Sequence, residues 1–89
     1  MADMIKVPYG ELFKRAQGIR QQAESVRNEI RTLSDTISSI QWMGKRAERF
    51  FQMWDEARPK MEEWAATLEG FAADLENQAR RMQAADESF

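Results

Sequence analysis

The chain has 89 residues, of which 43% are hydrophobic and 31% are charged, a balance typical of one domain spanning residues 1–89. Its apolar runs all fall short of the roughly 18 residues that a membrane span requires. The net charge of -2 gives no general attraction to nucleic acid. The sequence contains neither histidine nor cysteine, so we expect no catalytic site, no metal site and no cofactor.

The first predicted element is a helix over residues of about 8–40. Pro8 suits its first turn, because a proline there loses no helical hydrogen bond. From Leu12 onward, apolar residues recur at alternating steps of four and three, which is a heptad seam on one helix face. The seam residues are Leu12, Ala16, Ile19, Ala23, Val26, Ile30, Leu33, Ile37 and Ile40.

The seam stops at the tripeptide Trp42-Met43-Gly44, close to the middle of the chain. Gly44 can adopt a left-handed backbone conformation without the steric penalty of a side chain, so we predict a turn over residues 41–45. We expect the ring of Trp42 to fold over the end of the hairpin.

A second helix is predicted over residues of about 46–83, where the seam restarts and only Arg58 interrupts it. Two helices joined by a short connection must lie antiparallel, so the fold class is an all-α two-helix hairpin. Residues 84–89 follow the last seam residue and are predicted to form a flexible tail. The second seam comprises Ala47, Phe51, Trp54, Met61, Ala65, Leu68, Ala72, Leu75, Ala79 and Met82.

Pro59 conflicts with a regular second helix. A proline inside a helix removes one hydrogen bond and crowds the carbonyl four residues earlier, here that of Asp55. The seam nevertheless keeps its phase from Trp54 to Met61, which are seven residues apart. This phase retention favours a continuous helix with a kink near Pro59 over a complete break.

The second helix carries another apolar stripe beside its seam. One partner helix cannot cover both stripes, and an apolar arc this wide is typical of a four-helix bundle. We therefore expect two hairpins to dimerise into such a bundle. The alternative is that these side chains only fill space around the proline kink. The expected interface residues are Phe50, Met53, Ala57, Trp64 and Phe71.

Pairs of a glutamate and a base four residues later support both helices on their solvated faces. They predict helical structure and no ligand. The pairs are Glu11 with Arg15, Glu56 with Lys60, and Glu76 with Arg80.

The chain resembles the Trp-x-Gly (WXG) family of small early-secreted-antigen-like proteins over essentially its whole length. The resemblance implies a helical hairpin that forms a homodimer, or a heterodimer with another W-x-G protein. It also implies export of the folded protein by the type VII (ESX-like) secretion system of Gram-positive or related bacteria. The matching features are the run Ile5-Lys6-Val7-Pro8, Leu12, Ala16, the corner Trp42-Met43-Gly44, and Phe50 six residues after the glycine.

An FtsK/SpoIIIE-type ATPase is the receptor that the resemblance implies. The protein would then be cytoplasmic before export and secreted afterwards, as an effector, a carrier or a structural component. Met1 to Lys6 lack the basic-then-apolar order of a cleaved signal peptide, so we expect no general secretory export, whereas this argument leaves a route for folded proteins open.

The family's export signal combines the W-x-G corner of one subunit with a Tyr-x-x-x-Asp/Glu motif beyond the second helix of the other. Here the matching segment begins at Met82 and keeps the acid, Asp86, but lacks the tyrosine. A looser variant of the signal accepts other hydrophobic residues, and Met82, Asp86 and Phe89 fit its spacing. Either this subunit uses the looser signal, or a partner chain carries the tyrosine. A third interpretation makes Met82 the last seam residue and Asp86 a solvated charge.

The main alternative is a non-secreted bacterial coiled-coil adaptor protein. It explains both seams but leaves the placement of the corner and of Met82 and Asp86 to chance. Contact with a membrane interface also stays open, because amphipathic helices with Trp and Phe can lie in one, although the sequence offers no specific support for it.

Overall fold

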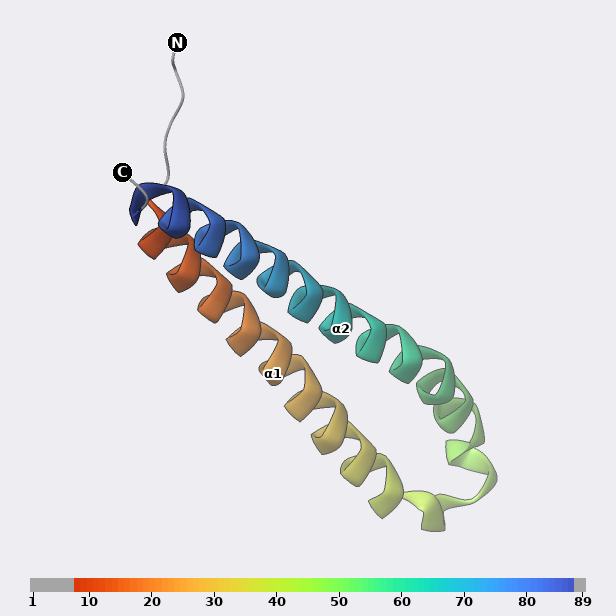
Figure 1. Ribbon diagram of the computed structural model, residues 1–89. Helices are drawn as coiled ribbons and strands as arrows, with labels where there is room; N and C mark the ends of the chain where they lie inside the picture. The colour runs from red at the N-terminus through yellow and green to blue at the C-terminus, as the bar shows by residue number, and fades with distance from the viewer. Residues whose placement is uncertain (1–7, 88–89) are drawn as a thin grey trace.

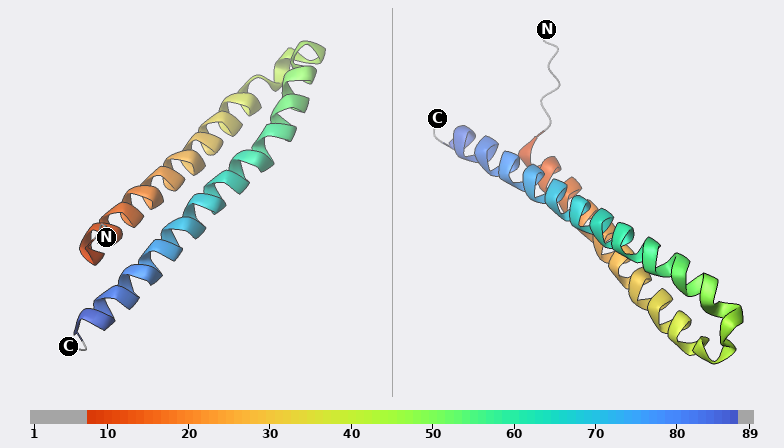
Figure 2. Two further views of the ribbon diagram at one scale, coloured as in Figure 1. Left: turned by 90° about the horizontal axis from the view of Figure 1, so that it is seen from above. Right: turned by 90° about the vertical axis from the view of Figure 1, so that its right-hand side faces the viewer.

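The computed structural model describes residues 8–87, which form an antiparallel helical hairpin. Helix α1 runs over Tyr9–Ser39, the one-turn 3-10 helix η1 over Gln41–Met43, and helix α2 over Lys45–Glu87. The described part measures 67 × 22 × 13 Å, and α1 and α2 lie side by side along it in all three views (Figures 1 and 2). The predicted all-α hairpin is therefore confirmed.

Helix α1 begins directly after the proline that the sequence indicated. Pro8 is the N-cap, and its carbonyl accepts hydrogen bonds from the backbone N–H groups of Glu11 (2.9 Å) and Leu12 (3.2 Å). The ring of Pro8 fixes its φ at -58°, so this turn starts from a restricted backbone.

The core between the helices is thin and consists mainly of small side chains. Most of the larger seam residues flank it and stay partly exposed, and no large side chain among the described residues is fully buried. Alanine at alternate seam positions lets the two helices approach closely, but each alanine buries little apolar area. The buried residues are Ala16, Ala23, Ile30 and Ile37 of α1 and Ala47, Ala65, Ala72 and Ala79 of α2.

Helix α2 runs through Pro59 without a break. Pro59 is exposed, so the carbonyl of Asp55, which loses its helical partner, lies on the solvent side where water can satisfy it. Figure 1 shows the axis of α2 turning in its green segment, near the connection to α1.

The end of α2 differs from the prediction. The helix continues to Glu87 instead of ending near residue 83, so the first part of the predicted flexible tail is helical. Only the seam ends at Met82. The next residues include alanine, glutamine and glutamate, which are good helix formers on their own. Loss of the apolar pattern therefore does not end the helix.

Candidate functional site

The corner presents an exposed aromatic ring at the closed end of the hairpin. Trp42 is 80% exposed and Met43 is 40% exposed, so the expectation that Trp42 folds over the hairpin end was wrong. The turn of η1 directs Trp42 outward, while the partly buried Ile40 and the buried Ala47 close the seam at this end. The corner is thus available for contact with another molecule.

Gly44 makes the reversal of the chain possible. Its φ is +63°, in the left-handed region that the sequence predicted for it and that side chains disfavour. The carbonyl of Gly44 accepts a hydrogen bond from the N–H of Ala47 (3.1 Å), and the N–H of Met43 donates to the carbonyl of Ile40 (3.0 Å). The first bond closes the turn at the start of α2, and the second closes the single turn of η1.

A second exposed apolar surface lies along α2, and we call it the aromatic stripe: Phe50, Met53, Ala57, Trp64 and Phe71. The exposed fractions of its large side chains are 50% for Phe50, 59% for Met53, 55% for Trp64 and 53% for Phe71. Ala57 is exposed as well. These side chains point away from the core, so filling space around the proline kink does not explain them.

The half of the aromatic stripe nearest the corner forms a shallow hollow. Phe50, Met53 and Ala57 line it together with Trp54 of the seam, and the lining is almost entirely apolar. Apolar area of this kind, left in water on one flank of a helix, is typical of a protein interaction surface.

The opposite flank of the hairpin is polar and carries two ion pairs between the helices. Arg20 donates to Glu76 from Nε (2.8 Å) and Nη2 (2.6 Å), and Arg27 donates to Glu69 from Nε (2.9 Å) and Nη2 (2.6 Å). Glu69 and Glu76 each follow a seam residue, whereas Trp64 precedes one. A step of 100° per residue therefore places the ion pairs and the aromatic stripe on opposite sides of the seam.

These ion pairs change the ionisation of their members. Hydrogen bonds from Arg27 and Arg20 hold the pKa values of Glu69 and Glu76, respectively, below their ordinary value of 4.5. Neither pair was predicted from the sequence, where Glu76 was instead paired with Arg80 on the same helix. In the structure Arg80 donates to Asn77 (2.8 Å) instead. The sequence did contain a signal for these pairs, because arginines follow seam residues on the first helix and glutamates follow seam residues on the second.

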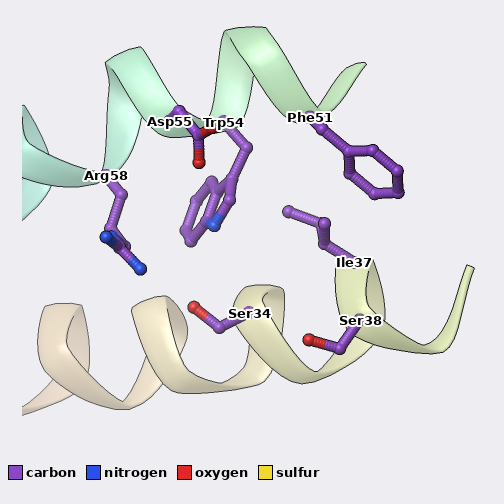
Figure 3. A pocket seen from close by; sticks show the side chains of 7 residues that line it. All are labelled: Ser34, Ile37, Ser38, Phe51, Trp54, Asp55 and Arg58. Carbon is purple, nitrogen blue, oxygen red and sulfur yellow. The ribbon is translucent and has the colours of Figure 1, made fainter. Parts of the chain in front are cut away.

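The seam opens where Arg58 interrupts it. A hollow of about 330 Å³ lies there between α1 and α2. Figure 3 shows Arg58 and the ring of Trp54 directed from α2 toward α1, with Ile37 directed back toward α2. Arg58 also approaches Glu62 at 3.9 Å. The polar groups that line the hollow include the carboxylate of Asp55 and the hydroxyls of Ser34 and Ser38. These groups do not form the hydrogen-bonded pair of nucleophile and base that covalent catalysis requires.

Two of the candidate export residues, Met82 and Asp86, lie far from the corner. Met82 is partly buried as the last seam residue, and Asp86 is exposed one turn later on α2, whereas Phe89 lies outside the described residues. Figure 1 shows this end of α2 beside the start of α1, at the end of the hairpin opposite the connection between the helices. The corner therefore cannot meet Met82 and Asp86 within one chain, and only two chains could combine them.

Residues 8–87 contain no cluster of three or more acidic, histidine or cysteine side chains that could hold a metal ion. None of the helices in this range is long and apolar enough to cross a membrane.

Comparison with known proteins agrees with this geometry. The family model described as "Proteins of 100 residues with WXG" matches residues 4–87. No curated protein matches the chain. The match includes both helices and the exposed Trp42-Met43-Gly44 corner, so the chain belongs to the WXG100 family and is a small protein associated with type VII secretion.

Proposed function

We propose that the protein is exported as a folded dimer by a type VII secretion system and acts through contacts with other proteins, as an effector, a carrier or a structural component. The observation that carries the proposal is the exposure of two separate apolar surfaces, the corner and the aromatic stripe, on a hairpin with a thin core. WXG100 proteins generally form dimers with other WXG proteins, and the aromatic stripe is the surface best suited to that contact.

The corner is free for a second role because the aromatic stripe does not include it. Trp42 is the most exposed large apolar side chain of the described residues. An aromatic ring held outward on a short turn fits a pocket of a receptor, and large aromatic side chains contribute disproportionately to binding. We assign this contact to the secretion ATPase.

Export of the Trp42→Ala variant tests the proposal. Because the ring is 80% exposed, its removal should leave helicity and dimer mass nearly unchanged while secretion into the medium is lost. The experiment requires a host with a working type VII system and a matched strain without its ATPase. Tyr9→Ala, which removes a ring at the far end of the hairpin, is the control and should still be exported.

Two results would contradict the proposal. Secretion of the unaltered protein from the strain without the ATPase would exclude this route. Normal export of Trp42→Ala would remove the corner from receptor recognition and leave it a structural turn.

A further inference from the structure

The large and small side chains of the aromatic stripe follow one another along α2 in an order that lets the stripe pack against a reversed copy of itself. Its main row contains Phe50, Ala57, Trp64 and Phe71, at intervals of seven residues. When the row is reversed about its midpoint, Phe50 aligns with Phe71 and Trp64 aligns with Ala57. The largest side chain then faces the only small one.

Resting on the proposed dimer, we propose that the partner is a second copy of this chain, with the two α2 helices antiparallel across a two-fold axis that passes between Ala57 and Trp64. Each Trp64 packs over the partner's Ala57, and each Phe50 packs against the partner's Phe71. A two-fold interface uses the same patch on both subunits, so a finite row of four buries all its members only when the axis passes through its centre.

The antiparallel orientation of the two α2 helices follows from the polar character of α1 on the flank that carries the row. A two-fold axis parallel to the hairpin would place α2 against the partner's α1. The α1 positions that correspond to the row are Arg15, Gln22, Glu29 and Thr36, which are all polar and exposed. An axis perpendicular to the hairpin instead places α2 against α2, which buries the apolar side chains on one another.

Charge complementarity supports the same register. Next to the row lie Arg49, Glu56 and Lys60 in the half of α2 near the corner, and Glu63 and Asp74 in the other half, all exposed. With Phe50 opposite the partner's Phe71, Arg49 lies within two residues of the level of the partner's Asp74. Lys60 lies within two residues of the level of the partner's Glu63 and offsets the negative charge of Glu56, which lies equally near that level. Two residues rise only about 3 Å along a helix, so both pairs are within reach.

Other registers lose these contacts. A shift of one heptad in one direction places Trp64 against the partner's Trp64 and leaves Phe50 without an aromatic partner. The opposite shift places Ala57 against Ala57, which leaves a gap, and moves Phe71 past the end of the row. Gaps and overpacked sites both weaken an apolar contact, so the central register is the one that the row specifies.

Engineered disulfides test the register directly, because the chain has no natural cysteine. A disulfide requires Cβ atoms roughly 4 Å apart, and successive row positions are about 10 Å apart along the helix. Ala57→Cys mixed with Trp64→Cys should form a covalent dimer under mild oxidation, whereas neither variant alone should. Gln52→Cys, on the opposite flank of α2, is the matched control and should stay uncrosslinked in every mixture.

A size swap tests the same contact without oxidation, in case Trp64→Cys weakens the dimer. Ala57→Trp should raise the dimer dissociation constant by roughly 100-fold, because it creates two overpacked sites per dimer. The double variant Ala57→Trp, Trp64→Ala restores one large and one small member per contact and should recover most of the affinity. Light scattering against concentration measures all three proteins.

Each alternative has its own outcome. Crosslinking of Ala57→Cys alone, or of Trp64→Cys alone, would show a register shifted by one heptad and overturn the inference. A dimer with no crosslink in any mixture would exclude α2 against α2. A folded monomer that pairs only with a second W-x-G protein would make the interface heterodimeric. Export, measured separately, would stand unaffected in all of these cases.

Discussion

Gly44 is the residue whose backbone decides the shape of the molecule. At a φ of +63° an added Cβ would meet no atom within 4 Å, so the effect of a substitution there is one of backbone strain alone. A left-handed conformation costs a residue with a side chain about 1–2 kcal/mol.

Replacing Gly44 with alanine should therefore lower the melting temperature by roughly 4–8 °C for each kcal/mol lost, as expected for a domain of this size. Gly70→Ala is the matched control, because Gly70 is exposed inside α2 and a Cβ there also meets nothing. That change should raise stability by about 0.5–1 kcal/mol, since alanine favours the helix. Thermal unfolding followed by circular dichroism measures both. Equal melting temperatures for the two variants would show that the corner tolerates a side chain.

At the scale of the elements, the ion pairs of Arg20 with Glu76 and Arg27 with Glu69 connect α1 to α2 at two levels. Both carboxylates have a lowered pKa in the folded protein. A lowered folded pKa contributes stability that is present above the unfolded value and is lost as the pH falls through the folded value.

The melting temperature should consequently fall as the pH drops below the ordinary glutamate value of 4.5. The double variant Glu69→Gln, Glu76→Gln should reduce this acid dependence, because neither side chain can then be protonated. Glu24→Gln, Glu29→Gln is the control, since it removes two exposed charges from α1 without altering either pair. A pH profile of the first double variant identical to that of the unaltered protein would contradict a linkage through these pairs.

The last turn of α2 is the element expected to carry an export signal. Deletion of residues 84–89 leaves the whole seam through Met82, so the melting temperature and dimer mass should change little. Secretion should stop if Asp86 belongs to the looser signal, and Asp86→Ala alone should reduce it. Glu87→Ala, one residue later, is the control for loss of charge. Normal release of the truncated chain would place the signal on a partner subunit.

The whole molecule is a rod whose own core contains no fully buried large side chain among the described residues. A hairpin of 67 × 22 × 13 Å exposes most of both helices, and small single cores are marginally stable. Burial of the aromatic stripe on dimerisation would therefore contribute a substantial part of the stability of the folded chain.

The melting temperature should fall on dilution, because association of folded subunits stabilises them by mass action. Trp64→Ala should weaken the dimer by about 3 kcal/mol, the usual loss for a buried aromatic side chain. Trp42→Ala removes an equally large ring from the corner and should leave the concentration dependence unchanged. A dilution of about 100-fold should be enough to shift the equilibrium from dimer toward monomer. A melting temperature that does not change over this dilution would contradict an obligate dimer.

Local features of the fold could be determined from the sequence alone. The two seams predicted both helices, and the length of the connection required them to be antiparallel, because side-chain periodicity depends only on the geometry of a single helix. The left-handed conformation of Gly44 was equally local, since it follows from the absence of a Cβ. The position of the corner between the seams also indicated the family.

Only the tertiary structure decided how the two helices are rotated and aligned against each other. That alignment pairs Arg20 with Glu76 in place of the nearer Arg80, and it leaves Trp64 in solvent beside the seam. Each outcome depends on residues that are distant in the chain, and periodicity within one helix does not show which of them lie close together in the fold.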